Sequence, residues 1–342
     1  MTISCSTISA VSLALILAAC APPRDAQLVQ LQGPTMGTQY TVKLIVDGEF
    51  DSRTADAAIV DLLERIENAM STYRPDSEVS RFNRFASAEW FAVSPQVVDV
   101  VAAALEISRL TDGAFDVTVA PLIELWGFAG STGANGLPDA ERIAETQRRI
   151  GYQKLSVRTD PSAVRKTVPD VSLNLSAIAK GYAVDRVVEY LERRGIDDYL
   201  VEIGGEIKTQ GTNQNGALWR IGIEKPVVAA RAVQRIITPV DRGVATSGDY
   251  RNFFTVDGKR YSHTLNPGTG RPVTHTLASV TVLDETAMRA DALATALLVL
   301  GPQAGFSLAD KLQLPAYFVI REKQGFSERY TDAFTKYLVD QS

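Results

Sequence analysis

The sequence predicts an α+β fold, in which helices and strands are mixed within a single domain. Segments with helical spacing of apolar residues occur beside segments with strand-like alternation, so both kinds of element are expected. They do not follow the regular strand–helix–strand order of a doubly wound nucleotide-binding fold, and no linker divides the chain after its N-terminal segment. With 342 residues, 45% of them hydrophobic, the chain is long enough for one large core or two modest ones.

The N-terminus carries a short apolar run from Ile8 to Ala19, preceded by no Lys or Arg. The run is too short to span a bilayer comfortably and sits where the apolar region of a signal peptide belongs. It ends in Leu17-Ala-Ala-Cys20, which resembles the lipobox of bacterial lipoproteins. Small residues before a cysteine suit a signal peptidase, and the thiol of that cysteine can accept a lipid.

We therefore predict three regions: a lipoprotein signal peptide at 1–19, the lipidated Cys20 with a tether at 20–29, and a folded domain at 30–342. Alternatives are an ordinary secretory signal and an apolar core segment. Cleavage before Cys20 removes Cys5, so the mature domain would contain no free thiol and no disulfide.

The first part of the domain shows one strand and two helices. Gln39–Val46 alternates apolar and polar residues and is predicted as a strand. Thr54–Met70 repeats apolar residues at helical spacing. A second helix is expected to run to Thr111, with Ser94 as its N-cap and Pro95 at its first position.

The rest of the chain alternates less regularly between the two kinds of element. Asp139–Ile150 and Ala177–Arg194 are predicted as helices, and a third runs from Glu285 to Leu300, with Asp284 as cap and Gly301-Pro302 as stop. The remaining predicted strands are Tyr199–Thr209, Trp219–Ile223, Val233–Thr238, Leu277–Leu283 and Ala316–Ile320.

Composition excludes several classes of function. The formal net charge of −5 argues against a nucleic-acid-binding protein, which would show a basic patch or stripe. Apart from Cys20, the mature domain has no cysteine for zinc binding or nucleophilic catalysis. Two histidines cannot build a His-rich metal site, and the chain contains neither a Walker A motif nor a dinucleotide-binding glycine fingerprint.

The predicted helix around residues 285–300 carries a candidate metal site. Asp291 and Thr295 are four residues apart, so the carboxylate and the hydroxyl lie on one helical face. Both are hard oxygen ligands of the kind that Mg²⁺ prefers, and Mg²⁺ usually keeps positions open for phosphate oxygens. The alternative is an ordinary pair on a solvated face, but the small and apolar neighbours favour a buried carboxylate that needs a partner.

Two further segments have features of an anion site. Lys180 is close to the start of a predicted helix, against the dipole preference, which is reasonable if a pyrophosphate also binds there. The alternative is a surface lysine. Gly204 and Gly205, in Ile203-Gly-Gly-Glu206, permit either close approach by a ligand or a bulge in or at the end of a strand.

His263 occupies a segment rich in Gly and Pro, from Tyr261 to Pro272. A histidine in such a loop can reach a site held by rigid elements and act as a base near neutral pH, or it can be a packing or surface histidine. Tyr73 and Phe115 are candidates to pack on a flat ring, with ordinary core aromatics as the alternative.

Taken in order, these segments resemble the ApbE family, the FAD:protein FMN transferases, over residues 33–336. The motifs that carry the resemblance are Met36-Gly-Thr, Ser71-Thr-Tyr-Arg-Pro-Asp-Ser77, Gly113-Ala-Phe-Asp116, Ala179-Lys-Gly-Tyr-Ala-Val-Asp185, Ile203-Gly-Gly-Glu206, Thr246-Ser-Gly-Asp-Tyr250, His263-Thr-Leu-Asn-Pro267 and Asp291-Ala-Leu-Ala-Thr295. The resemblance implies an ApbE-like single domain with antiparallel-rich sheets and packed helices.

The resemblance also implies roles for individual residues. Asp291 and Thr295 would bind Mg²⁺ with the backbone carbonyl of Ala177. From its position beside this site, we hypothesise that His263 takes the proton of the attacking hydroxyl, so that His263 and Asp291 are the candidate catalytic residues. The residues that would contact FAD are Met36, Tyr73, Ala114, Phe115, Asp116, Asn174, Lys180 and Leu265. Asn174 and Asn266 stand where the family usually has Asp; at Asn174 the hydrogen-bonding shape is kept and one charge is lost.

The implied function is a Mg²⁺-dependent transfer of FMN from FAD to a Thr or Ser hydroxyl of a partner flavoprotein, with release of AMP. The implied acceptors are flavoprotein subunits of membrane redox complexes. The enzyme would be anchored by its lipid in the cell envelope, facing the periplasm or the exterior. Two alternatives remain open: a Mg²⁺-dependent FAD pyrophosphatase giving FMN and AMP, and a non-catalytic flavin-binding lipoprotein.

Overall fold

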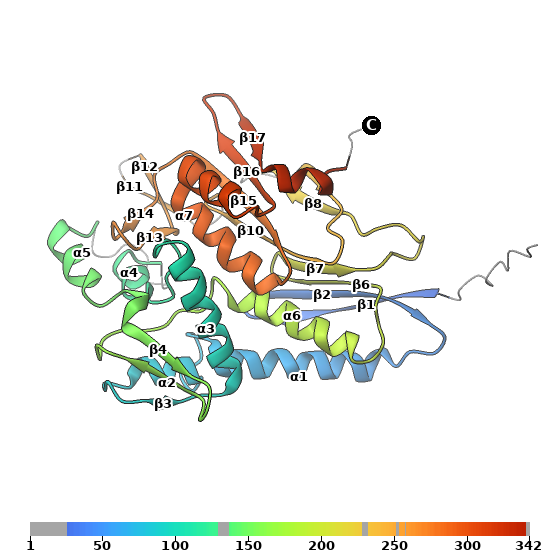
Figure 1. Ribbon diagram of the computed structural model, residues 1–342, viewed down its shortest axis with the longest axis horizontal. Helices are drawn as coiled ribbons and strands as arrows, with labels where there is room; N and C mark the ends of the chain where they lie inside the picture. Colours follow the sequence, from blue (N-terminus) through green and yellow to red (C-terminus); the bar gives the residue numbers. More distant parts are fainter. Residues whose placement is uncertain (1–25, 129–136, 228–231, 251–252, 257, 340–342) are drawn as a thin grey trace, which may run out of the picture.

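An eight-stranded sheet forms the centre of the molecule in the computed structural model, which describes residues 26–128, 137–227, 232–250, 253–256 and 258–339 (Figure 1). Its strands are β1 (Ala26–Thr35), β2 (Thr38–Asp47), β6 (Tyr199–Ile203), β7 (Glu206–Gln210), β10 (Arg242–Gly248), β15 (Leu277–Asp284), β16 (Ala316–Arg321) and β17 (Phe326–Tyr330). They are ordered β1-β2-β6-β7-β10-β15-β16-β17, and each neighbouring pair is antiparallel. The predicted α+β fold with antiparallel-rich sheets is confirmed.

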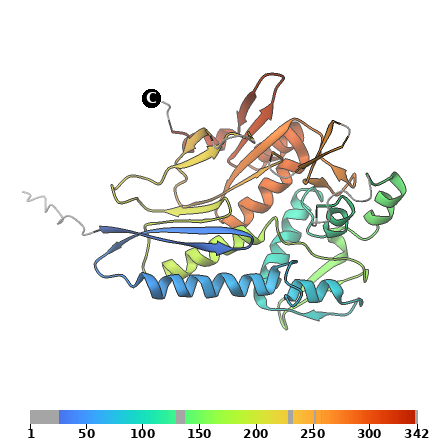
Figure 2. The same cartoon turned by 180° about the vertical axis from the view of Figure 1, so that it is seen from behind.

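The helices of the described residues are α1 (Ser52–Met70), α2 (Glu78–Arg84), α3 (Pro95–Leu110), α4 (Ala120–Leu125), α5 (Ala140–Gln147), α6 (Ala179–Glu192) and α7 (Ala287–Lys311). Of these, α1, α6 and α7 cover one face of the sheet, and α3 packs against α1 and α7. In order along the sheet, α1 packs on β1, α6 on β6 and β7, and α7 on β10 and β15 (Figures 1 and 2). The start of α3, with Ser94 as N-cap and Pro95 at its first position, is as predicted.

Strand alternation divides the apolar side chains between two cores. In β16, Ala316 and Phe318 face the large core under the helices, while Tyr317 and Val319 belong to a second cluster on the opposite face. The elements over that second face are the hairpin of β8 (Ile221–Glu224) and β9 (Val233–Ile237) and the 3₁₀ helix η2 (Asp332–Tyr337). The small remaining elements are β3 (Phe91–Ala92), β4 (Leu155–Arg158), β5 (Ala163–Lys166), η1 (Tyr152–Lys154), β11 (Phe253–Val256), β12 (Lys259–Ser262), β13 (Leu265–Asn266) and β14 (Arg271–Pro272).

The segment predicted as one strand at Tyr199–Thr209 forms two strands in the structure. It folds back on itself as the β6–β7 hairpin, with Ile203 paired to Glu206. Gly204 and Gly205 form the two-residue turn, with φ of 60° and 104°. Positive φ at both positions suits glycine, so the paired glycines mark a hairpin turn and not a bulge.

The boundaries of α7 also differ from the prediction. Thr286, not Asp284, caps the helix by accepting a hydrogen bond from the backbone N–H of Arg289. The predicted stop is real: Gly301 is non-helical with φ of 81°, and a second helical segment follows from Pro302. The helix is long and apolar enough to cross a membrane, but its most apolar stretch is 61% buried in the fold, as expected of a core helix.

At the N-terminus, strand β1 begins at Ala26 and pairs with β2 along its whole length. Residues 26–29, which the sequence placed in a tether, are therefore part of the sheet. The strand was missed because its residues alternate only weakly between apolar and polar. The predicted signal peptide at 1–19 and the predicted lipidation site at Cys20 lie outside the described residues.

The crossing of α6 and α7 is very close. A Cβ at Gly181 would lie 2.2 Å from the carbonyl oxygen of Ala287, so only glycine allows this approach. One turn later, the carboxylate of Asp185 accepts hydrogen bonds from the backbone N–H groups of Ala287 and Met288, each at 2.9 Å. A side chain of α6 thus caps the first turn of α7, whose N–H groups have no partner within their own helix.

Replacing Asp185 with Ala is expected to lower the free energy of unfolding by about 1–3 kcal/mol, because two partly buried N–H groups lose their acceptor. Chemical denaturation at neutral pH measures the effect. The matched control is Glu285→Ala, whose side chain is 85% exposed near the same helix end and should change stability by less than about 0.5 kcal/mol. Equal losses in the two variants would contradict the capping role.

Candidate active site

Two hairpin turns and the start of a helix meet at one end of the sheet. The β1–β2 turn holds Met36, the β6–β7 turn holds Gly204, and the first turn of α6 holds Lys180. The N–H of Gly204 donates to the carbonyl of Gln39 at 3.1 Å. A Cβ at Gly204 would lie 2.8 Å from Thr38 Cγ2 and 3.2 Å from Lys180 Cδ, so the two hairpin turns and the lysine are in direct contact.

A buried charge cluster adjoins these turns. The ammonium of Lys180 lies 2.9 Å from Glu206 Oε2 and 3.7 Å from Asp291 Oδ2. Asp291 Oδ2 also accepts a hydrogen bond from the N–H of Gly181 at 3.2 Å. Glu206 and Asp291 are 4% and 3% exposed, and the Lys180 side chain is 29% exposed, so the lysine is the open side of the cluster.

The two carboxyl groups of this cluster have raised pKa values, chiefly because both are buried. Burial raises the pKa of Glu206 to about 8, although Lys180 opposes the shift. Burial also raises the pKa of Asp291, against the effects of Lys180 and the Gly181 N–H. Burial lowers the pKa of Lys180, but the Asp291 and Glu206 carboxylates outweigh it and hold that pKa above its usual range. If both carboxylates are ionised, one ammonium leaves a net charge of −1, so a bound cation would favour their ionised forms.

The predicted metal ligands lie beside this charge. Thr295 is one turn after Asp291 on α7, and its hydroxyl is 3.1 Å from the hydroxyl of Ser247 on β10. Ala177 is partly buried in the segment that leads into α6. Within the described residues, no group of three or more His, Cys, Asp or Glu is arranged to hold a metal, so a cation here would need carbonyl, hydroxyl and substrate oxygens in addition to the Asp291 carboxylate. Such hard oxygen donors beside a net negative charge fit Mg²⁺.

The loop after α3 is tied to the segment before α6. The N–H of Asn174 donates to the carbonyl of Val117 at 2.7 Å, and Asn174 Oδ1 accepts from the N–H of Ser176 at 2.9 Å. An aspartate at position 174 would make the same turn, so Asn fits this role. Asp116 accepts hydrogen bonds from Thr118 and from the N–H of Tyr152, which satisfy its buried carboxylate.

The predicted FAD contacts differ in how much of each side chain is exposed to a ligand. The ring of Phe115 is 2% exposed and packs in the large core, so it cannot stack on a ligand, and any contact would come from its backbone. Its neighbour Ala114 is partly exposed. Tyr73, in contrast, is 84% exposed and projects from the loop between α1 and α2.

His263 and Leu265 lie on the connection that leads into β13, a strand that contacts α7. The ring of Phe128 meets the imidazole of His263 edge-on, with the ring centroids 6.4 Å apart. Leu265 is buried in a small cluster with Trp126, whose indole N–H donates to the carbonyl of Gly270 at 2.8 Å. The short helices α4 and α5 therefore hold this loop in place.

Sequence reasoning missed Glu206 and Ser247 as site residues. Both belong to quoted motifs, Ile203-Gly-Gly-Glu206 and Thr246-Ser-Gly-Asp-Tyr250, but neither has a local pattern that indicates its partner. A buried acidic residue directly after a glycine turn was the available signal for Glu206.

The chain matches the ApbE family over residues 36–318. It is 46% identical to a protein of Vibrio cholerae over 95% of this chain and 96% of that protein, and 41% identical to one of Haemophilus influenzae over 97% of each. Both relatives are named FAD:protein FMN transferase.

The chain belongs to the ApbE family.

The solved structure of the flavin transferase ApbE from Vibrio cholerae has the same fold. It superposes with a TM-score of 0.84 at 46% identity, covering 92% of this chain and all of that one. The fold of that structure therefore extends over most of this chain.

Proposed function

We propose that this chain is a Mg²⁺-dependent FAD:protein FMN transferase, which moves FMN from FAD to a Thr or Ser hydroxyl of a partner protein. The observation that carries the proposal is the cluster of Lys180, Glu206 and Asp291, one turn from Thr295, in a chain whose relatives bear this activity in their names. The cluster combines an open cation with buried carboxylates, which is the charge pattern needed beside a metal–pyrophosphate substrate.

The reaction balances as a phosphoryl-type transfer. The acceptor hydroxyl attacks the FMN phosphorus, a new P–O bond forms, and the bond from this phosphorus to the bridging oxygen breaks. That oxygen leaves with AMP, and the acceptor retains FMN as a phosphoester. Asp291, Thr295 and the Ala177 carbonyl would hold Mg²⁺, which would supply charge neutralisation at the pyrophosphate when bound.

The other proposed residues bind and orient the substrate. Lys180, on the open side of the cluster, is placed to pair with a pyrophosphate oxygen. Met36, Tyr73, Asn174, Leu265 and the Ala114–Asp116 loop would contact FAD. His263 would accept the proton of the attacking hydroxyl, because imidazole can do so near neutral pH and its loop is held against α7.

To test the proposal, a candidate acceptor is incubated with FAD, Mg²⁺ and the enzyme, and the mass of the acceptor is measured by mass spectrometry. We expect a mass gain of one FMN with wild type and at least about a hundredfold lower rate with Asp291→Ala, because the carboxylate ligand is lost. Calorimetry should show loss of Mg²⁺ binding in the same variant. Asp310→Ala, an exposed change on the same helix, is the control and should behave as wild type.

Three outcomes of this assay argue against the proposal. Free FMN and AMP with an unmodified acceptor would support hydrolysis of FAD in place of transfer. Full activity of a folded Asp291→Ala protein would refute the metal assignment. A stable yellow protein that releases no AMP would indicate flavin binding without turnover.

The proposed base is tested by His263→Ala. The rate of transfer at saturating FAD should fall roughly a hundredfold or more, with little change in KM for FAD, because the loss concerns proton transfer and not binding. His275→Asn changes the only other histidine and should retain the wild-type rate. A near-normal rate in the His263 variant would show that another group takes the proton.

We also propose that the enzyme is lipid-anchored at Cys20 in the cell envelope and acts on flavoprotein subunits of membrane redox complexes. The support is the Leu17–Cys20 pattern after the apolar run. Expressed in a bacterium, wild type should incorporate labelled palmitate and sediment with membranes. Cys20→Ser should do neither, yet keep its transfer activity in detergent-free solution. Membrane sedimentation of an unlabelled wild-type protein would argue against lipidation.

A further inference from the structure

The turn that carries Met36 has an unusual backbone. Thr35 and Thr38 are paired, so Met36 and Gly37 form a two-residue hairpin turn, with φ of 48° and 69°. Turns with positive φ at both positions favour Asn-Gly or Gly-Gly, because a larger side chain is strained there. Methionine in such a position persists only where surrounding contacts hold it, and strain of this kind gathers at binding sites.

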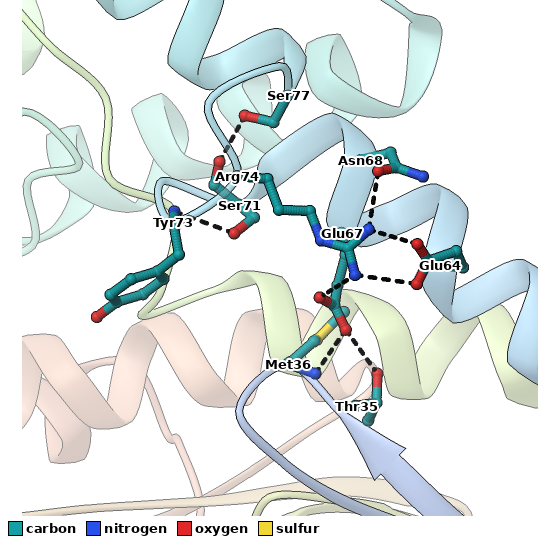
Figure 3. Close-up of polar contacts among 9 residues, drawn as sticks. All are labelled: Thr35, Met36, Glu64, Glu67, Asn68, Ser71, Tyr73, Arg74 and Ser77. Carbon is teal, nitrogen blue, oxygen red and sulfur yellow. Dashed lines mark hydrogen bonds and ion pairs between the residues drawn. The ribbon is translucent and has the colours of Figure 1, made fainter.

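Glu67, in the last turn of α1, supplies that contact. Its Oε1 accepts hydrogen bonds from the N–H of Met36 at 2.7 Å and from the hydroxyl of Thr35 at 3.3 Å (Figure 3). The N–H at the first position of a two-residue hairpin turn has no partner within the hairpin. The carboxylate therefore secures the strained residue directly.

Arg74 links the same carboxylate to the loop of Tyr73. Its guanidinium donates to Glu67 Oε2 at 2.7 Å, to Glu64 Oε2 at 2.9 Å and to Asn68 Oδ1 at 2.8 Å (Figure 3). The planar guanidinium of Arg74 is thus held by several hydrogen bonds, and this restricts the backbone of Tyr73, the preceding residue. Within the loop, the N–H of Tyr73 donates to Ser71 Oγ at 3.1 Å, while its ring points away from the network.

The network lies at the rim of the fold. The Glu67 and Arg74 side chains are 18% and 32% exposed, and neither belongs to the hydrophobic core. Tyr73 is 84% exposed, so core packing does not require its position. What the network does define is the placement of two residues, Met36 and Tyr73, that come from different chain segments.

We propose that Glu67 and Arg74 are positioning residues that fix Met36 and Tyr73 relative to one another as parts of the FAD site. This inference rests on the proposed function, in which those two residues contact FAD. Glu67 acts by holding the Met36 turn, and Arg74 acts by joining Glu67 to the Tyr73 loop. Neither side chain needs to touch the substrate.

The test measures FAD affinity by flavin fluorescence titration with Mg²⁺ present, and KM and kcat for transfer, in the full chain. Glu67→Ala and Arg74→Ala should each weaken FAD binding and raise its KM about tenfold, with kcat within about twofold of wild type. The double variant should be little worse than either single one, because both act through one connection. Glu67→Gln, which keeps an acceptor for the Met36 N–H, should lie between wild type and Glu67→Ala.

Asp61→Ala is the matched control. It removes an exposed carboxylate that pairs with Arg65 on the same helix, away from the network, and should leave FAD affinity and the melting temperature unchanged. Melting temperatures of all variants separate a loss of folding from a loss of positioning. If Glu67→Ala fails to fold, the FAD affinity and KM of Glu67→Gln and Arg74→Ala test the positioning role.

Three results would overturn the proposal: unchanged FAD affinity in the folded variants, additive effects in the double variant, or lower kcat and stability at unchanged KM. The proposed function is tested separately, because it depends only on whether the wild-type protein binds FAD and transfers FMN. A wild type that binds FAD but transfers nothing would refute transferase activity, while the binding titrations would still decide the positioning role. A wild type that does not bind FAD would refute both.

Discussion

The close crossing of α6 and α7 is the contact on which the candidate site depends. Gly181 lets the two helices meet backbone to backbone, and Asp185 caps the first turn of α7 from the neighbouring helix. This fixes Lys180, at the start of α6, against Asp291 in α7. A side chain at position 181 would force the helices apart and separate the charges, so a residue with no chemistry of its own controls the electrostatics of the site.

Charge balance supports the proposal that the site binds a metal-bound dinucleotide. Burial raises the pKa values of Glu206 and Asp291, and a single lysine does not offset both carboxylates. A cation beside Asp291 would relieve this imbalance, and the open face of Lys180 would then meet phosphate oxygens. The same reasoning explains why the proposed metal ligands include no histidine or cysteine: Mg²⁺ prefers hard oxygen ligands, which carboxylate, hydroxyl and carbonyl groups supply.

Much of the fold could be predicted, because helices and strands leave local periodic signals. Helices α1, α3 and α6 were predicted with boundaries close to those observed, and the predicted stop at Gly301-Pro302 coincides with the break inside α7. Strand β1 was missed, since its alternation is weak, and the β6–β7 hairpin was read as one strand because paired glycines fit both a bulge and a turn. Phe115 was a candidate stacking ring from its type alone, whereas its burial depends on packing that no local pattern reveals.

By itself, the sequence determined which residues share a local element. The spacing of Asp291 and Thr295 on one helical face follows from helix geometry, and the Leu17–Cys20 pattern is readable without any fold. Only the tertiary structure decided which polar groups meet: Lys180 of α6 with Glu206 of β7, and Glu67 with both the Met36 N–H and Arg74. The physical reason is that such partners are brought together by sheet register and helix crossing, and these depend on the packing of the whole core and on no single stretch of sequence.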